Sequence, residues 1–534
     1  MGELSGALHG PLPYGRGSVT LALVLLVAVC AEGAPPVCAG CHPKETARFL
    51  QSCMGNSVAP PAPRPDGRVT HDASGSVLTI EQRGGRMVHR LWEAGFTAEY
   101  PIDYQIGANL FGYSYIVRVG DYFSQSPLSW YKRHGWDLSP GFESWQALDF
   151  DRPINEACLY CHTGATKFSG PDGRRVVSAT LVPITCERCH GPSREHLRHP
   201  SAATIVNPAK LTGRVRASVC EQCHLEGLVR PLNPGKSLSD FQPGQKLEDV
   251  MTAYVSNRHE TGANVVNHVE QLSVSRCARE SGGRMWCGTC HHPHGEPVDR
   301  KQQMRGICRS CHASLSKTAH PSEQMDCVSC HMPHSAASDV QHSAITDHRI
   351  LARPLPLEQP PVEALEHLEA WAEPPAQFRQ RNLGLAELLV ALAKNVPKLT
   401  ESGLSILENL GPGKVNDDPL VLSVLGSVRR NRGDLANAIS FHQRAAEAQP
   451  DGADYALSLG YDLRMAGDFE GAERELRRAI GLDPSLQRAY LELAGLYYGR
   501  QRKADALATL DQYLKWNPGS ITFRIQKAQL MAAQ

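Results

Sequence analysis

The sequence has few aromatic residues, no excess of charge of either sign and no long hydrophobic run beyond one near its start. Aromatic residues make up 6 % of the 534 positions, which disfavours a large aromatic-rich β-sandwich. Lys plus Arg number 55, as do Asp plus Glu, so the charge indicates no nucleic-acid partner. The lack of repeated apolar runs excludes a polytopic membrane protein, and 46 Gly with 37 Pro excludes a collagen-like fibre. The length fits two to four domains.

Two residue types, 17 Cys and 23 His, are arranged in a pattern that recurs seven times, Cys-x-x-Cys-His. The seven motifs comprise Cys38, Cys41 and His42; Cys158, Cys161 and His162; Cys186, Cys189 and His190; Cys220, Cys223 and His224; Cys287, Cys290 and His291; Cys308, Cys311 and His312; and Cys327, Cys330 and His331. At this content, chance gives on the order of a few hundredths of one match. Only Cys30, Cys53 and Cys277 lie outside the motifs.

The spacing has a chemical reason. Two cysteines three positions apart place their thiols to add across the two vinyl groups of one haem, and the adjacent His lies under the iron as its proximal ligand. The sequence therefore predicts seven covalently attached haem c groups with iron bound by the seven motif histidines. The residues between the cysteines need no side-chain chemistry for this role. No catalytic residue is predicted.

Other uses of cysteine and histidine explain the pattern less well. Structural zinc would need two Cys-x-x-Cys halves or a second His pair for each ion, and it does not explain a His directly after every second Cys. A disulfide scaffold would not keep each pair at a two-residue spacing, and redox Cys-x-x-Cys motifs do not recur sevenfold. The haem interpretation is therefore favoured.

The start of the chain indicates export. Residues 19–31 form a short apolar run after Arg16, which is typical of a secretory signal peptide and too short to span a bilayer. Residues 1–31 are therefore predicted to be a signal peptide, with Cys30 as an alternative lipid anchor. Haem attachment to this motif takes place outside the cytoplasm, so we expect an exported protein in the periplasm or at the cell surface, without a transmembrane span after signal removal.

The chain divides into two parts of different composition. Residues 36–350 hold all seven motifs and form the predicted seven-haem cytochrome domain, which is expected to be loop-rich with a short helix at each motif. Within it, residues 68–131 alternate as strands do and predict a β-rich insertion, an antiparallel meander. Arg174, Arg175, Arg194, Arg276 and Arg284 are candidate partners for haem propionates.

A Pro-rich linker at 351–376 leads to a domain at 377–534 with a 34-residue period. Leu425, Leu459 and Leu493 follow this period, as do Pro450, Pro484 and Pro518 and the small residues Ala438, Ala472 and Ala506. The period predicts three tetratricopeptide repeats at 419–452, 453–486 and 487–520, with looser helices before them and a terminal helix after them. The fold class is thus α+β multidomain, a loop-rich cytochrome domain with a small β insertion followed by an all-α solenoid.

The second axial position of each iron determines whether a substrate can reach it. Thirteen other histidines lie between residues 71 and 348, enough to supply seven distal ligands, and this favours saturated iron at most haems. The candidates are His196, His268, His294, His334, His342 and His348. Met54 is an alternative distal ligand for the first haem, and His292 is interpreted as a surface residue.

The chain resembles the bacterial multihaem cytochromes of the cytochrome c-554 class that carry C-terminal tetratricopeptide repeats. The resemblance covers nearly the whole mature chain and rests on residues 125–131 (QSPLSWY), 138–141 (LSPG), 186–192 (CERCHGP), 266–270 (VNHVE), 275–277 (SRC), 290–294 (CHHPH) and 345–350 (ITDHRI). It implies that His196, His268, His294 and His348 are distal ligands. His334 follows Met332-Pro333 where related chains often carry a basic residue, which leaves the choice among His334, His342 and His348 open.

Two functions follow from these observations. The first is electron transfer, in which a series of haems relays electrons between redox protein partners and the repeats dock a partner. The alternative is a multihaem oxidoreductase that acts on a small nitrogen or sulfur compound at one open-site haem. No Cys-x-x-Cys-Lys motif, the common mark of nitrite-reducing enzymes, occurs in the sequence. A further alternative is an oxidising haem that is linked to a tyrosine of the β-rich insertion.

Overall fold

The computed structural model describes residues 35–107, 111–170, 173–178, 180–256, 264–296, 299–314, 320, 322, 325–353, 365–410 and 417–533. The predicted signal peptide at 1–31 and the candidate lipid anchor Cys30 lie outside these residues. Among the described residues, no helix is both long and apolar enough to cross a membrane.

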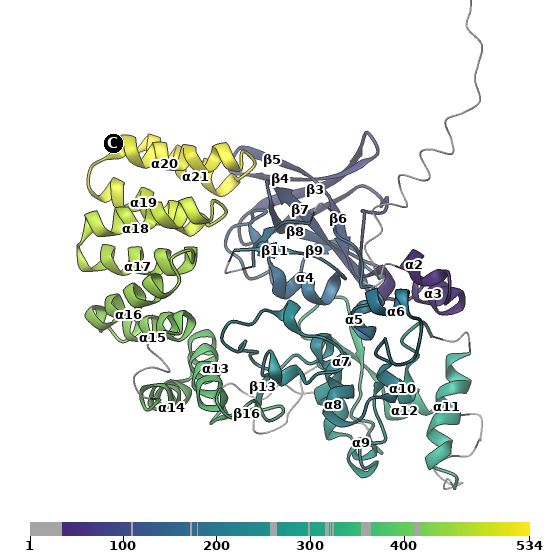
Figure 1. Ribbon diagram of the computed structural model, residues 1–534. Helices are drawn as coiled ribbons and strands as arrows, with labels where there is room; N and C mark the ends of the chain where they lie inside the picture. The colour runs from purple at the N-terminus through teal and green to yellow at the C-terminus, as the bar shows by residue number, and fades with distance from the viewer. Residues whose placement is uncertain are drawn as a thin grey trace, which may run out of the picture.

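Two antiparallel sheets follow the first motif and lie beside the end of the repeat domain (Figure 1). The first sheet is a meander of β2 (Gly67–His71), β3 (Ser76–Arg83), β4 (Arg86–Glu93) and β5 (Phe96–Pro101). Alternate residues of β3, among them Leu78 and Ile80, are fully buried, which matches the alternation seen in the sequence. Their packing places a hydrophobic core on one face of this sheet.

The second sheet has eight strands and is larger than the predicted insertion at 68–131. Its strands are β1 (Val58–Ala59), β6 (Tyr104–Ile106), β7 (Gly112–Val119), β8 (Tyr122–Tyr131), β9 (Gly135–Leu138), β10 (Arg152–Ile154), β11 (Phe168–Ser169) and β12 (Arg175–Val176). Strands β9, β10 and β12 all pair with β8. The strands beyond residue 131 have two to four residues each, too short for a visible alternation, so the sequence pattern did not reveal them.

A short helix holds all or part of each Cys-x-x-Cys-His motif. These helices are α2 (Pro35–Ala39), α4 (Glu156–His162), α5 (Glu187–His190), α7 (Gly213–His224), α10 (Cys287–Cys290), α11 (Arg300–Cys311) and α12 (Cys327–His331). The backbone N–H of His190 donates to the carbonyl of Cys186 at 2.9 Å, and that of His291 to Cys287 at 2.9 Å. One helical turn therefore brings both thiols and the imidazole of a motif to adjacent positions.

The C-terminal part is a column of paired helices (Figure 1). It consists of α13 (Arg379–Lys394), α14 (Pro397–Glu408), α15 (Pro419–Asn431), α16 (Leu435–Ala448), α17 (Ala453–Ala466), α18 (Phe469–Leu482), α19 (Gln487–Gly499), α20 (Lys503–Trp516) and α21 (Ile521–Ala532). The periodic residues Ala438, Ala472 and Ala506 are fully buried. A Cβ atom on Gly460 would lie 2.9 Å from Leu476, so small residues permit the close approach of the two helices in a pair.

The repeat column is joined to the sheets at its C-terminal end. The Ser520 hydroxyl donates to Asp149 at 2.7 Å, and the Tyr100 hydroxyl donates to Asn517 at 2.7 Å. Ile521 of α21 belongs to the same hydrophobic core as Leu78 of β3. This end of the solenoid is thus part of the core of the first sheet.

The repeat column also contacts the cytochrome part elsewhere. Strand β16 (Leu368–Ala370), within the predicted linker, pairs with β13 (Tyr254–Ser256). The Asn382 amide of α13 donates to Asn233 at 2.8 Å. Arg174, a candidate propionate partner by sequence, forms ion pairs with Asp454 at 2.9 Å and Asp483 at 3.3 Å in the repeats. The solenoid is therefore held along its length and is not a free arm.

A buried carboxyl group at this junction predicts a pH-dependent stability. Burial and the neighbouring Asp149 raise the pKa of Asp151 to about 7, and one of its oxygens has no hydrogen-bond partner. Because an unfolded chain ionises Asp near pH 4, this group destabilises the fold progressively as the pH rises from about 4 to about 7. We expect Asp151→Asn to raise the midpoint of thermal unfolding by roughly 2–4 °C at pH 8 and much less at pH 4.

The measurement is thermal unfolding followed by circular dichroism at both pH values. Asp72→Asn, at an exposed position, is the matched control and should change neither midpoint. A gain from Asp151→Asn that is the same at pH 4 and pH 8 would contradict the assignment.

Candidate functional site

All seven Cys-x-x-Cys-His motifs line one continuous cavity of about 4080 Å³. Every cysteine and histidine of the seven motifs contributes to its wall. The volume averages about 580 Å³ for each motif, within the range of roughly 300–1,000 Å³ typical of a site for one organic cofactor. The fold therefore brings motifs that lie as much as 289 positions apart in the sequence, Cys38 and Cys327, to one interior space.

Five motif histidines lie opposite a second imidazole at nearly the same spacing. The ring centres are 6.4 Å apart for His42 and His196, 5.9 Å for His190 and His294, 6.0 Å for His224 and His268, 6.2 Å for His291 and His348, and 6.0 Å for His331 and His320. Two metal–nitrogen bonds of about 2 Å, with each ring centre about 1 Å behind its nitrogen, give a separation of about 6 Å. The spacing fits one metal ion between the two rings of each pair.

Hydrogen bonds orient several of these imidazoles. The Nδ1 atom of His190 lies 2.8 Å from the carbonyl of Val206, that of His331 2.9 Å from Leu351, and that of His348 2.7 Å from Thr346. The Nδ1 atom of His291 lies 2.8 Å from a carboxylate oxygen of Glu296. A ring that donates from Nδ1 keeps Nε2 unprotonated as a metal ligand, and ligating histidines commonly have such partners.

Burial keeps the central histidines neutral. It lowers the pKa of His268 to about 3, with additional repulsion from His348, His224 and His291. Burial also lowers the pKa of His162, His224 and His348. Only the neutral imidazole binds a metal ion. A lowered pKa favours that neutral form, so these histidines are suited to bind iron. The residues of the cavity therefore fit haem with axial histidines.

The candidate distal residues fall into two groups. His196, His268, His294 and His348 each lie opposite a motif histidine, whereas the structure does not bring His334 or His342 to such a position. His334 is exposed on the cavity wall near Thr346, and His342 stacks on His134 outside the wall. Met54 lines the cavity, but His196 holds the place opposite His42. His292, expected at the surface, also lines the cavity and packs edge-on against His294.

Sequence reasoning missed His320, which lies opposite His331. It occurs in the loop between the sixth and seventh motifs and has no motif of its own; the only available signal was its place between two closely spaced motifs. Among the described residues, no imidazole lies opposite His162 or His312. His162 is half-buried, and its backbone carbonyl accepts a hydrogen bond from the Ser57 hydroxyl at 2.7 Å.

Residues between the cysteines of three motifs contact one another, and no sequence pattern predicted these contacts. The Tyr160 hydroxyl of the second motif donates to Gln222 of the fourth at 2.8 Å, and the Gln222 amide donates to the carbonyl of Arg188 in the third at 3.1 Å. The Arg188 guanidinium lies 4.1 Å from the centre of the Tyr160 ring. These contacts fix the second, third and fourth motifs relative to one another.

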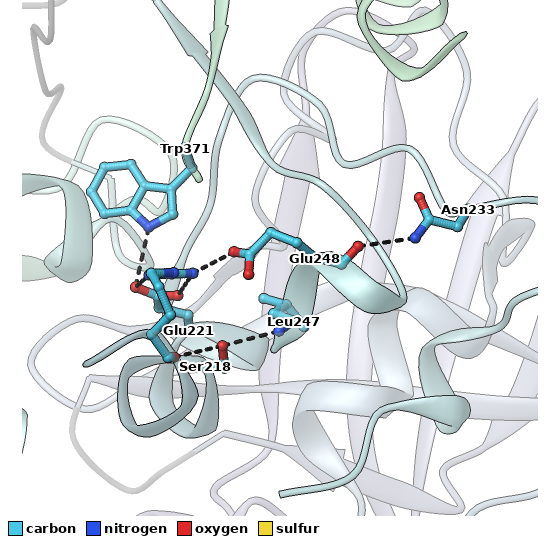
Figure 2. Close-up of polar contacts among 7 residues, drawn as sticks. Ser218, Glu221, Asn233, Leu247, Glu248 and Trp371 are labelled. Atoms are coloured by element: carbon cyan, nitrogen blue, oxygen red, sulfur yellow. Dashed lines mark hydrogen bonds and ion pairs between the residues drawn. The ribbon is translucent and has the colours of Figure 1, made fainter. Parts of the chain in front are cut away.

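A second network holds helix α7, which carries the fourth motif (Figure 2). Glu221, between its cysteines, accepts a hydrogen bond from the Trp371 indole at 3.1 Å and pairs with Arg214 at 2.6 Å. Arg214 also pairs with Glu248, and the Ser218 hydroxyl accepts from the Leu247 amide at 3.0 Å. Because Trp371 lies in the predicted linker, this network ties the linker to a motif helix.

Two stretches of the chain match known families. Residues 280–317 match the family model described as a doubled CXXCH motif, and residues 463–530 match the tetratricopeptide repeat model. The first match spans the fifth and sixth motifs. The second covers α18 to α20 and most of α21.

Individual relatives match parts of the chain. Multiheme cytochrome MtrA of Shewanella baltica is 25 % identical over 200 residues, which cover 34 % of this chain and 47 % of MtrA; the chain thus spans less than half of that relative's length. The TPR repeat-containing thioredoxin TTL4 of Arabidopsis thaliana is 33 % identical over 72 residues, 14 % of this chain and 11 % of TTL4. A crystal structure of MamA superposes with a TM-score of 0.24 at 20 % identity over 27 % of this chain and 79 % of MamA.

The motifs, their shared cavity and these matches define a c-type cytochrome, a protein that binds haem covalently. More particularly, the chain is a multihaem c-type cytochrome with C-terminal tetratricopeptide repeats.

The spacing of His190 and His294 leads to a prediction for one axial ligand. We expect His294→Met to raise the reduction potential of one haem, or to leave that haem high-spin, while the other haems keep their properties, because Met ligation raises the potential of haem iron. The measurement is a spectroelectrochemical titration combined with electron paramagnetic resonance.

His334→Met is the matched control, because His334 lines the same cavity without a motif histidine opposite it. It should leave all haems unchanged. If His334→Met alters a haem and His294→Met alters none, then His334 and not His294 is the axial ligand.

Proposed function

We propose that this protein is an exported seven-haem c-type cytochrome that relays electrons between redox partners. The fourteen motif cysteines hold the haems as thioethers, and His42, His162, His190, His224, His291, His312 and His331 are the proximal iron ligands. Bound haem c supplies one-electron chemistry, because its iron alternates between two oxidation states. The polypeptide supplies position, axial ligands and exclusion of water.

His196, His294, His268, His348 and His320 are the proposed distal ligands for the first, third, fourth, fifth and seventh motifs. Their spacing from the motif histidines, 5.9 to 6.4 Å between ring centres, supports this assignment. A haem with two axial histidines has no position for a substrate, so at these five sites the ligands favour electron transfer over catalysis.

The observation that supports the relay most strongly is that each motif has another motif as a neighbour in space. Cysteines of different motifs lie close enough to shift each other's pKa: Cys186 raises the pKa of Cys38, Cys223 lowers that of Cys161, Cys287 raises that of Cys220, and Cys327 helps to raise that of Cys308. These contacts join the first motif to the third, the second to the fourth, the fourth to the fifth and the sixth to the seventh.

The three groups of motifs that result are themselves connected. Gln222 bonds to Arg188 and so joins the fourth motif to the third, and His294, just after the fifth motif, lies opposite His190 of the third. Cys290 and Cys308 interact electrostatically and join the fifth motif to the sixth. The seven sites thus form one connected set in the interior, branched at the fourth motif, and a relay requires such a connection.

The repeats are proposed to dock a protein partner. Stacked tetratricopeptide repeats offer extended surfaces for protein binding, and the ion pairs from Arg174 to Asp454 and Asp483 hold this surface in a fixed position beside the haem cavity. A partner bound there would be presented to the cytochrome part in one orientation. Export to the periplasm or cell surface, with Cys30 as a possible lipid anchor, is part of the proposal.

The relay predicts rapid sharing of electrons within one molecule. When pulse radiolysis introduces less than one electron per protein, we expect haem absorbance to redistribute in a first-order process whose rate does not depend on protein concentration. The mass of the purified protein should equal the processed polypeptide plus seven haems. A variant with Cys220→Ser and Cys223→Ser, which lacks the central site, should retain six haems and show slower redistribution.

Electrons that stay on the haem first reduced in the unaltered protein would contradict the relay. The comparisons do not favour the alternative, an oxidoreductase acting on a small nitrogen or sulfur compound. Turnover of nitrite or hydroxylamine by the purified protein would nevertheless establish it, and the assay uses the same preparation.

A further inference from the structure

His134, Asp137 and His342 form a compact cluster that the haem sites do not use. His134 lies in the turn between β8 and β9, and Asp137 lies in β9. His342 lies in the loop that joins β14 (His334–Ala336) to β15 (Ala344–Thr346), the hairpin directly after the seventh motif. None of the three residues lines the haem cavity.

The cluster has the geometry of three converging ligands. The Nε2 atom of His342 lies 2.7 Å and that of His134 3.5 Å from the same oxygen, Oδ2 of Asp137. One ligand atom from each of the three residues lies within 4.8 Å of the others. In a tetrahedral zinc site with bonds of about 2.1 Å, neighbouring ligand atoms are roughly 3.4 Å apart, so small side-chain movements suffice to bind one ion.

Other contacts hold the ligands in place. Oδ1 of Asp137 accepts a hydrogen bond from the Leu138 amide at 2.8 Å, which leaves Oδ2 directed at the two imidazoles. The His342 ring packs edge-on against Tyr131, with ring centres 4.9 Å apart. Next to it, Gln341 donates a hydrogen bond to Glu143. A carboxylate fixed in this way needs little reorganisation to bind a cation.

Two features point to a ligand rather than to a simple ion pair. The imidazole rings of His134 and His342 are stacked in parallel at 3.7 Å, an arrangement that two protonated rings would oppose by repulsion. His342 also has a backbone φ of 52°, in the left-handed region that non-glycine residues rarely adopt. Such conformations concentrate at functional sites, where the surroundings impose them.

The surroundings permit a cation. The side chains of Asp137 and His342 are 28 % and 29 % exposed, so water can complete the coordination. The neighbouring Lys132 and Arg133 are exposed in the same turn, whereas Glu143 lies on the hairpin side and adds negative charge. Two imidazoles and one carboxylate are the donors that zinc and related divalent cations prefer.

We propose that His134, Asp137 and His342 bind one divalent transition cation of the Zn²⁺ type. The ion joins the second sheet to the β14–β15 hairpin and so fixes the chain just after the seventh motif. The site lies outside the haem cavity, and its occupancy does not depend on the proposed relay.

The test uses the full-length protein with its haems, freed of loosely bound metal by a chelator. Equilibrium dialysis against Zn²⁺, with zinc and iron counted by mass spectrometry, should give one zinc per protein and unchanged iron. His342→Gln and Asp137→Asn should each weaken binding at least tenfold. His199→Gln is the matched control, because His199 faces only one carboxylate, Glu195 at 3.9 Å, and it should bind zinc as the unaltered protein does.

Thermal unfolding supplies a second measurement. Zn²⁺ should raise the unfolding midpoint of the unaltered protein and of the His199 variant but not that of the His342 variant, because an ion that binds only the folded state stabilises it. If His342→Gln fails to fold, His134→Gln in the exposed turn replaces it. The proposal would be overturned if the unaltered protein bound no stoichiometric zinc ion, or if His199→Gln weakened zinc binding as much as His342→Gln does.

Discussion

The seven Cys-x-x-Cys-His motifs must all face one interior space, and the rest of the chain is arranged around that requirement. The motif helices have only four to twelve residues, and the cysteines and histidine of every motif line the shared cavity. Some segments return an imidazole to a distant motif: helix α6 (Arg194–Arg198) places His196 opposite His42 on the wall of the cavity. The second imidazole of a pair thus also fixes how separate parts of the chain lie together.

The polypeptide reinforces this arrangement with buried polar contacts. Tyr160, Arg188 and Gln222 occupy positions that covalent haem attachment leaves free, and they link three motifs directly. Glu221 connects the fourth motif to Trp371 beyond the cytochrome part. Hydrogen bonds between polar side chains in a low-dielectric interior favour one arrangement, and a relay needs fixed distances between its sites.

The repeat domain is integrated with the cytochrome part rather than attached through a linker alone. Ile521 completes the core of the first sheet, and Asn382 bonds to Asn233 near the other end of the column. A partner held by the repeats would therefore keep a defined position relative to the haem sites. The same contacts explain why residues of the predicted linker include a paired strand, β16.

The sequence by itself determined the covalent anchors, the motif histidines and the 34-residue period, because each depends on spacing over a few neighbouring residues or one helical pair. It also suggested His196, His268, His294 and His348. Only the tertiary structure placed these four and His320 opposite motif histidines, left His334 and His342 away from such positions, and brought His342 beside His134, because proximity in space has no local pattern in the sequence. The short strands after residue 131 and the contacts of Arg174 and Asp149 with the repeats likewise arise from packing between segments far apart in the chain.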